Sequence, residues 1–519
     1  MADRYWVGGT GLWSSTNTAN WSSDPSSSRV GGASVPTQSD NVYFDQYSGS
    51  GTVTLNSAAG SSTRNCYNLD MTGFTGTLTT SQASVSLDVY GTSIILSNTG
   101  TFDSANYPTL KLRSGTTTTI LTRGQTVGNL TILDNSTLVL QDNLIGHNNT
   151  QLYLDYGVFT ANGKDVAMGY FNDNNSTNAK TVNMGSGTWN MLGSGPVEYT
   201  QVSATVSRGP GQAWVIQQPA YFTLNKGTSK LRFLKAGDAA GLDVALTNSP
   251  SETSVVIHES SGWPSSGRVL IDNEEIEYSA LSNNTLTISK RGANGTQLAA
   301  HAEDSAVILL YDTKTTLTTA INDGTSTSDI VVASTTGFPT AGTLLIDGEI
   351  IQYFSTTSTN FGSNIFNSVT YTLTRGLASG GIGTAHSIGA VVRHAEAREF
   401  WGGGKDYNVI DFYNAGGYFS TNCLGGFTAS VIQSGGVLGI QNIYFDAFDI
   451  YGTGPCTYST TDFYLKGTNQ QPIYCNTAPW SANTARQYNV EYYSTGNPGT
   501  NSLMPYIDRK IHDFFDVIS

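Results

Sequence analysis

Short segments in which apolar and polar residues alternate recur along almost the whole chain, while helical periodicity is nearly absent. Examples are Val85–Val89, Leu110–Leu112, Leu130–Ile132 and Leu152–Leu154. Alternation with a period of two turns one face of a strand inward, so these segments predict strands of only a few residues each. Chains built from such strands without helices fold as sandwiches, barrels or β-solenoids.

From about Gly124 onward, the residues between the apolar segments favour a solenoid. Asn135, Asn162 and Gly163 stand where one short apolar segment ends and the next begins. A coil of a parallel β-helix needs Asn or Gly where the backbone turns, because these residues tolerate left-handed dihedral angles. We therefore predict an all-β chain with a β-solenoid or β-helix-like body, and a sandwich is the alternative.

Two segments, Thr253–Tyr278 and Ser328–Tyr353, repeat one pattern without a gap. The paired positions are Gly262/Gly337, Pro264/Pro339, Gly267/Gly342, Leu270/Leu345, Ile271/Ile346, Asp272/Asp347, Glu274/Glu349 and Tyr278/Tyr353. Both copies then run to an Arg-Gly pair, a Gly-Thr pair and a histidine, His301 or His386. A tandem repeat of this kind is a duplicated folding unit, more often a spacer or binding module than part of one catalytic pocket.

Five further phrases are characteristic, Gly157–Gly163, Met184–Asn190, Leu224–Ser229, Phe400–Asn408 and Thr461–Gly467. They resemble phrases of repetitive β-helix proteins of bacteriophages and bacterial surfaces. The opening stretch, from Tyr5 to Asp45, also resembles the start of many phage structural proteins. In such proteins the phrase ending near Phe233 runs on closely to the phrase around Gly402, whereas here the duplicated unit separates them. The resemblance thus implies two small β-sandwich or barrel-like modules inserted into one solenoid; the alternative is a linear series of domains.

This organisation predicts six segments. They are an N-terminal cap or attachment segment at 1–50, the first part of the solenoid at 51–248, module repeats at 249–320 and 321–395, the second part of the solenoid at 396–505, and a C-terminal helix or tail at 506–519. Trp6, Trp13 and Trp21 are expected to cover the apolar end of the solenoid. Ile507, Ile511, Phe514, Phe515 and Ile518 fall at helical spacing and predict a short helix, which either caps the last coil or docks into a neighbouring subunit.

Composition excludes several classes of protein. The net charge is −14 and no basic run occurs, which disfavours nucleic-acid binding. No apolar run is long enough to span a membrane, and the first residues lack the apolar stretch of a signal peptide. Cys66, Cys423, Cys456 and Cys475 match neither a disulfide scaffold nor a zinc pattern, so we expect buried free thiols and no metal or cofactor.

The candidate chemical groups fall into two sets. Among the histidines His147, His258, His301, His386, His394 and His512, the repeated pair is expected to hydrogen-bond a turn in each module. Asp272-Asn273 and Asp347-Gly348 are predicted as two-residue hairpin turns rather than calcium ligands. Asp406, Asp411, Asp446, Asp449, Asp462 and Glu491 lie among Tyr444, Phe445, Phe448, Tyr451 and Tyr464, a mixture that suits glycan cleavage or a subunit interface. We predict no catalytic, cofactor-binding or metal-binding residue.

The resemblance implies a non-enzymatic structural component of a phage virion, a tail fibre or a tail- or baseplate-peripheral protein. Such a protein is assembled in the host cytoplasm and becomes extracellular in the released particle. Its expected partners are other virion proteins, a host surface glycan or receptor, and further copies of itself, without nucleic acid or membrane insertion. Alternatives are a capsid decoration or head-fibre protein, a polysaccharide depolymerase and a bacterial surface adhesin.

Overall fold

The chain consists almost entirely of β-strands, which form parallel sheets in one part and antiparallel sheets in another. The computed structural model describes residues 1–55, 63–82, 85–102, 108–174, 176–193, 211–234, 236–310, 314–324, 328–336, 338, 342–346, 349–366, 369–375, 383–395, 398–403, 405–411, 413, 419–420, 427–434, 444–445, 462–466, 474–475 and 489–493. In this part of the chain the helices are single 3₁₀ turns, η2 (Pro219–Tyr221) and η3 (Ala293–Gly295). None of them has the length and apolar character needed to cross a bilayer.

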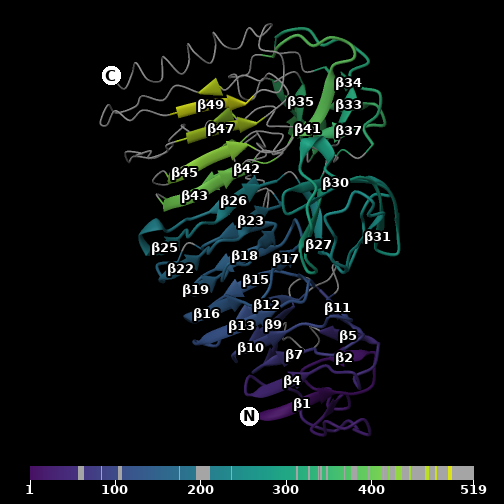
Figure 1. Cartoon of the computed structure of the whole chain (residues 1–519), viewed down its shortest axis with the longest axis vertical. Coiled ribbons are helices and arrows are strands. Elements are labelled where there is room, and N and C mark those ends of the chain that lie inside the picture. Colours follow the sequence, from purple (N-terminus) through teal and green to yellow (C-terminus); the bar gives the residue numbers. More distant parts are fainter. Residues whose placement is uncertain are drawn as a thin grey trace.

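The parallel sheets form a β-solenoid, shown upright in Figure 1. Sheet A contains, in spatial order, β25 (Phe222–Asn225), β22 (Lys180–Asn183), β19 (Gly157–Thr160), β16 (Ser136–Leu140), β13 (Thr117–Leu121), β10 (Ser93–Ile95), β7 (Leu69–Asp70), β4 (Asp40–Tyr43), β1 (Ala2–Trp6) and β3 (Trp21–Ser22). Sheet B contains β11 (Thr101–Phe102), β8 (Thr77–Thr80), β5 (Thr52–Leu55) and β2 (Gly11–Trp13).

Two further sheets complete the solenoid. Sheet C contains β44 (Phe419–Ser420), β42 (Arg398–Trp401), β24 (Gly211–Val215), β21 (Tyr170–Asn172), β18 (Gln151–Leu154), β15 (Leu130–Ile132), β12 (Thr109–Leu112), β9 (Ser86–Val89) and β6 (Thr63–Cys66). Sheet D contains β14 (Thr126–Val127), β17 (Leu144–Gly146), β20 (Val166–Met168), β23 (Thr188–Met191), β26 (Lys230–Phe233), β43 (Lys405–Asp411), β45 (Phe427–Ser434), β47 (Asp462–Lys466) and β49 (Asn489–Tyr493). A short parallel pair joins β46 (Tyr444–Phe445) to β48 (Tyr474–Cys475).

Each coil stacks apolar residues directly over those of the coil before it. In sheet D, Val166 pairs with Trp189, Trp189 with Leu231, and Leu231 with Ile410, and all four are buried in one continuous core. The corners carry the residues that the sequence predicts for them. Asn135 and Asn162 have φ angles of 58° and 55°, which lie in the left-handed region that asparagine tolerates.

The N-terminal end of the solenoid is closed by aromatic side chains. Trp6, Trp13 and Trp21 are fully buried, and the Trp21 ring lies 5.2 Å from that of Trp6 and 5.1 Å from that of Trp13. The two-residue strand β3 pairs antiparallel with β1, so the parallel stacking ends there. Because β1 and β4 are themselves parallel neighbours in sheet A, the closing segment already contributes strands to the solenoid.

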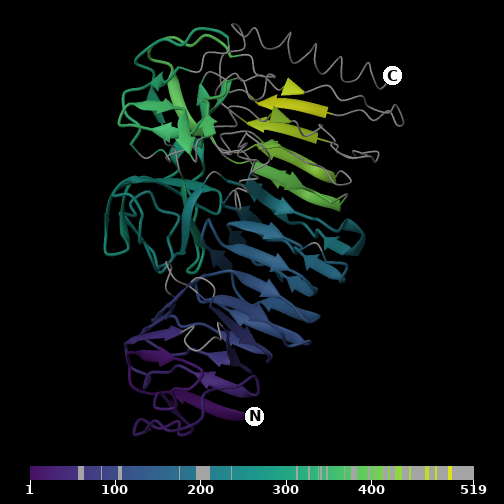
Figure 2. The same cartoon turned by 180° about the vertical axis from the view of Figure 1, so that it is seen from behind.

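Two sheets of the solenoid contain neighbouring strands that lie far apart in the sequence. Strand β24 pairs in parallel with β42, and β26 pairs in parallel with β43. The residues between β26 and β42 form two antiparallel units, which Figures 1 and 2 show lying along one side of the solenoid. We call the unit formed by β27–β32 module 1 and the unit formed by β33–β41 module 2.

The two modules share one arrangement of strands. Module 1 contains β27 (Ala236–Gly241), β28 (Ser254–Val256), β29 (Gly267–Ile271), β30 (Glu274–Ser282), β31 (Thr285–Lys290) and β32 (Ala306–Leu310). Module 2 contains β33 (Lys314–Thr316), β34 (Ile330–Val331), β35 (Gly342–Ile346), β36 (Glu349–Tyr353), β37 (Ser355–Thr356), β38 (Asn360–Gly362), β39 (Asn364–Phe366), β40 (Val369–Tyr371) and β41 (Val391–Ala395). The isolated bridges Leu242–Ile257 and Leu246–His301 in module 1 recur as Leu317–Val332 and Ile321–His386 in module 2.

The predicted fold class is confirmed, because the described chain is all-β and combines a parallel β-solenoid with antiparallel sheets. The C-terminal helix expected at 506–519 lies outside the described residues.

Replacing Trp189 by alanine should lower the free energy of unfolding by about 3–5 kcal/mol, because the ring is fully buried and leaves a large cavity. Its ring packs edge-on against Phe159 and Trp214. Urea unfolding followed by circular dichroism measures the change. As a control, Thr181→Ala on the same coil alters a partly exposed side chain and should change stability by no more than about 0.5 kcal/mol. Equal losses in the two variants would contradict this account of the core.

Candidate functional site

The repeated Ile-Asp-x-Glu phrase forms a β-hairpin in each module. In module 1, β29 and β30 pair antiparallel with Ile271 opposite Glu274, and Asp272 adopts a left-handed φ of 54°. The predicted turn at Asp272-Asn273 is thereby confirmed. In module 2, Ile346 lies opposite Glu349 in the same register, while Asp347 and Gly348 lie outside the described residues.

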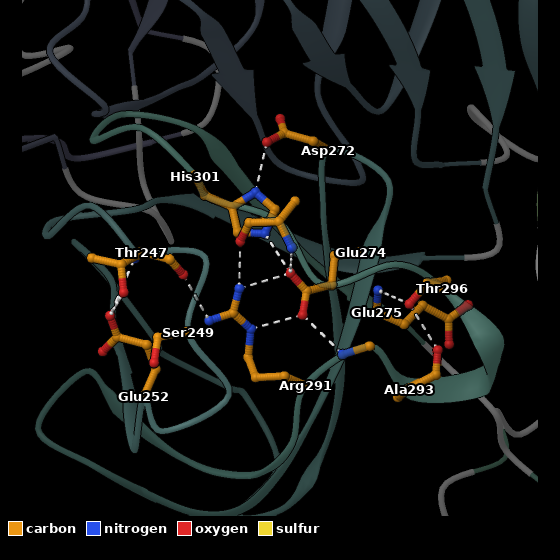
Figure 3. Close-up of polar contacts among 12 residues, drawn as sticks. Thr247, Ser249, Glu252, Asp272, Glu274, Glu275, Arg291, Ala293, Thr296 and His301 are labelled. Atoms are coloured by element: carbon orange, nitrogen blue, oxygen red, sulfur yellow. Dashed lines mark hydrogen bonds and ion pairs between the residues drawn. The ribbon is translucent and has the colours of Figure 1, made fainter.

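A buried carboxylate, that of Glu274, holds three separate segments of module 1 together (Figure 3). Its oxygens accept hydrogen bonds from Arg291 Nε at 2.7 Å and Arg291 Nη2 at 2.8 Å. The backbone N–H groups of Gly292 and Ala299 donate to it at 2.8 and 2.9 Å. Arg291 also donates to the carbonyl oxygen of Ala299 at 2.6 Å. The loop after β31 is therefore fastened to the hairpin by charge-assisted hydrogen bonds.

His301 completes this network from the other side. Its Nδ1 lies 2.7 Å from Oδ2 of Asp272 and its Nε2 lies 2.9 Å from Oε2 of Glu274, as Figure 3 shows. Two ionised carboxylates accept from both ring nitrogens only if both nitrogens carry protons. Burial lowers the pKa of His301, but the hydrogen bonds and charges of Asp272 and Glu274 outweigh it and raise that pKa. The expectation that His301 bonds a turn is confirmed.

Module 2 repeats the same network with its own residues. Glu349 accepts from Arg375 Nε at 2.9 Å and from Arg375 Nη2 at 2.6 Å. His386 Nε2 lies 2.7 Å from the same carboxylate, and the Thr384 N–H donates to it at 2.9 Å. Arg375 also donates to the carbonyl oxygen of Asn322 at 2.5 Å and to that of Thr384. These contacts explain why the arginine, the Gly-Thr pair and the histidine recur together in both copies.

The arrangement is suited to holding the module together rather than to proton transfer. The side chains of Glu274, Arg291 and His301 are at most 2% exposed, and each charge has an opposite partner. Burial alone would raise the pKa of Glu274 and Glu349. The hydrogen bonds from arginine, histidine and backbone N–H groups prevail and lower each pKa to about 2. Both carboxylates therefore stay ionised across the neutral and mildly acidic range.

The turn of module 1 is also the place where the module is fastened to the solenoid. Arg232, on β26, is buried and donates to the carbonyl oxygen of Asp272 at 2.7 Å and to Oδ1 of Asn273 at 2.5 Å. Its Nε pairs with Asp411 of β43 at 3.0 Å. From the same solenoid segment, the Tyr413 hydroxyl donates to Glu275 at 2.7 Å. We call these contacts the Arg232 clamp.

Apolar side chains surround the Arg232 clamp. On the module side Leu270, Ile308 and Leu310 are buried, and on the solenoid side Ile145 and Leu234 belong to the same cluster. Ile145 lies one position from Leu144 of the core column on β17, so the outer side of sheet D is covered by module 1. Polar contacts at the centre and apolar contacts around them fix the position of module 1 on the solenoid.

Two of the candidate carboxylates, Asp406 and Asp411, lie in separate ion pairs. Asp411 is buried against Arg232, whereas Asp406 is exposed and pairs with Lys226 at 2.6 Å. Asp462 lies on β47 opposite Asn489 of β49, and Tyr464 lies opposite Glu491. Tyr444 and Phe445 form β46, while Asp446, Phe448, Asp449 and Tyr451 lie outside the described residues.

The remaining candidate residues have separate positions. His147 Nδ1 lies 2.7 Å from Asp238, and the His258 ring lies 3.6 Å from both Asp243 and Asp304. His394 is on β41, and His512, Cys423 and Cys456 lie outside the described residues. Cys66 is a buried free thiol whose pKa is raised by burial, and Cys475 is on β48. Among the described residues, no group of three metal-ligating side chains could hold a metal ion.

No protein-family model, curated protein or solved structure matches the chain. The functional argument therefore rests on the fold and on the contacts of its own residues.

Lowering the pH from about 4.5 to about 2 should progressively weaken both modules, because Glu274 and Glu349 lose the charge that their arginine and histidine partners stabilise. In Glu274→Gln, which leaves Arg291 buried without its counter-charge, hydrogen exchange of the β29–β30 hairpin should be accelerated already at pH 7. In contrast, Glu303→Gln at an exposed position should keep the acid sensitivity of the wild type. Wild-type protection in Glu274→Gln would show that the network does not hold the hairpin.

Replacing Arg232 by methionine should weaken the attachment of module 1 to the solenoid without unfolding the module. Arg232→Met leaves the buried Asp411 with Lys230, at 3.9 Å, as its remaining cationic partner and should cost about 1–3 kcal/mol. Hydrogen exchange of residues 271–275 should increase, while the strands β28 and β31 away from the clamp stay protected. Lys226→Met, which breaks a solvent-exposed pair with Asp406, is the matched control and should cost no more than about 1 kcal/mol. Unchanged exchange at 271–275 would show that the clamp does not position the module.

Proposed function

We propose that this chain is a non-enzymatic structural component of a bacteriophage virion, a tail fibre or a tail- or baseplate-peripheral protein. In this proposal the solenoid projects from the particle and modules 1 and 2 contact other virion subunits or the host surface. The protein assembles in the host cytoplasm and becomes extracellular with the released particle. The resemblance of its phrases to phage β-helix proteins supports this assignment.

The observation that carries the proposal is the fastening of a self-contained β-module to the side of a solenoid. Module 1 has its own apolar core, which includes Leu242, Val269 and Tyr278. The Arg232 clamp and the apolar residues around it hold this module in one orientation. A binding unit that is held rigidly loses less conformational freedom on contact than a tethered one, so its contact is stronger for the same surface.

The solenoid suits a protein that works outside the cell. Its coils bury one continuous apolar column, and each coil contacts mainly its neighbours. The column can therefore carry a lateral insertion without losing its own stacking. Such a body gives the protein length and rigidity, although only 12% of its residues are charged.

Fractionation of purified particles tests the location. Mass spectrometry of separated heads and tails should find the chain in the tail fraction, and labelled antibodies should mark the tail in electron micrographs. Detection in heads alone would support the alternative of a capsid decoration or head-fibre protein. Absence from particles would sink the proposal and leave a bacterial surface adhesin as the better explanation.

Register in the second part of the solenoid favours one other function, cleavage of a polysaccharide. Asp462 and Glu491 lie on the neighbouring strands β47 and β49, two positions apart in register. Backbone register thus brings two residues of the type that glycosidases use as a catalytic pair onto neighbouring strands. Release of reducing ends or unsaturated sugars from host capsule or lipopolysaccharide, abolished in Asp462→Asn, would establish this function instead.

Replacing residues 236–396 by a short Gly-Ser linker should leave a folded solenoid and abolish surface contact. Sheets C and D supply their own stacking across the gap through β24–β42 and β26–β43. Circular dichroism and limited proteolysis should still detect a resistant β-body, whereas particles carrying the deletion should adsorb to cells at least tenfold less. Lys226→Met in the solenoid is a control that should adsorb normally. Normal adsorption by the deletion particles would assign recognition to another part of the virion.

A further inference from the structure

Lys180 and Asp173 form an ion pair whose side chains are both completely buried. Lys180 begins β22 and Asp173 directly follows β21, and the distance from Nζ to Oδ2 is 3.6 Å. Other lysine–carboxylate pairs in the described part of the chain keep an accessible lysine, at 29% exposure for Lys226 and 26% for Lys230. The buried arginine pairs cannot lose a proton. At Lys180, therefore, a primary amine lies beside a carboxyl group in a site closed to water.

The carboxyl group of Asp173 is held by two backbone donors. The N–H of Gln217 donates to Oδ1 at 2.5 Å and the N–H of Gln218 donates to Oδ2 at 3.2 Å. A backbone N–H aimed at the oxygen that becomes negative stabilises the oxyanion of an acyl-transfer intermediate, and the Gln217 N–H is placed in this way on Oδ1. Burial raises the pKa of Asp173 above its usual range, although these donors and Lys180 oppose it. Burial therefore favours the neutral form of this carboxyl group.

The amine is held in place from the opposite side. Lys180 Nζ donates to the carbonyl oxygen of Asn174 at 3.0 Å and to that of Ser176 at 2.8 Å. Both acceptors belong to the short loop between Asp173 and Lys180. The loop thus fixes the position of its own lysine, which removes most of the entropic cost of bringing the two reacting groups together.

We propose that Lys180 and Asp173 join spontaneously through an isopeptide bond. The ammonium first passes a proton to the carboxylate, because two separated charges are costly in a dry interior. The neutral Nζ then attacks Cγ of Asp173, the N–H of Gln217 holds the negative Oδ1 of the tetrahedral intermediate, and the protonated Oδ2 is the leaving oxygen. The C–O bond breaks, and the hydroxyl leaves with one proton from Nζ as water. One amide and one water molecule form, and no other reactant is consumed.

The bond would lock the corner between β21 and β22 covalently. Its position ties sheet C to sheet A, since β21 and β22 are consecutive strands of these two sheets. This inference is independent of the proposed virion function.

Intact-mass spectrometry of the denatured full-length protein tests the bond. The wild type should be lighter than its sequence by the mass of one water molecule, and Lys180→Arg and Asp173→Ala should each show the full mass of their own sequences. Lys405→Arg is the matched control, because Lys405 lies nearby but bonds the carbonyl oxygen of Pro219, and it should keep the loss. A wild type at full mass overturns the proposal, and so does a loss that persists in Lys180→Arg, since that would be a dehydration without the amine.

Tryptic digestion of the wild type makes the test independent of how the variants fold. Trypsin does not cut after an acylated lysine, so the peptide from Asp165 should continue past Lys180 to Arg208 and should lack one water. Fragment ions should place the link between Asp173 and Lys180. Recovery of the peptide 165–180 at its full mass, with cleavage after Lys180, overturns the proposal by itself.

Discussion

The structure depends on one constraint, that each coil of the solenoid must place an apolar residue over the apolar residue of the coil before it. The column from Val166 through Trp189 and Leu231 to Ile410 shows that this rule holds even where the chain departs and returns. Parallel pairing alone does not specify which coils become neighbours. Burial specifies it, because a slip by one residue would turn the whole apolar set outward. The apolar side chains that β26 turns toward the core therefore determine where β43 pairs when the chain returns to the solenoid.

Each module has only a small apolar core of its own, so further contacts contribute strongly to its stability. A buried Glu–Arg–His network adds strong, directional contacts between the hairpin and the loops that follow it. Breaking such a network is costly because the remaining charges stay buried. The Arg232 clamp adds the same kind of contact between module 1 and the solenoid. Arg291 thus holds module 1 together internally, and Arg232 fixes it to the solenoid.

The sequence predicted what depends on local chemistry. Alternation indicated strands such as Leu130–Ile132, which is β15, and Asn162 indicated a corner that has the expected left-handed angle. The repeated phrase predicted the hairpin and the histidine contact. It did not reveal the Arg291–Glu274 pair, although the joint recurrence of glutamate, arginine and histidine was a signal for it.

Long-range contacts were beyond the reach of sequence reasoning. Asp411 stood out as a carboxylate among aromatic residues, and nothing near it in the chain indicates that it pairs with Arg232. That pairing follows from the register of β43 on β26, which is set in three dimensions. For the same reason, the turn at Asp272 could be predicted as a turn but not as a docking point.

The Arg232 clamp draws on three stretches of chain that are made at different times. Arg232 precedes module 1, the hairpin turn lies within it, and Asp411 and Tyr413 follow module 2. During synthesis, module 1 can therefore fold before the solenoid residues that it contacts have all been made. The last of its anchoring side chains leaves the ribosome only after module 2 has been translated. Module 1 therefore reaches its final position on the solenoid late. It does so as the solenoid strands before and after the two modules come together.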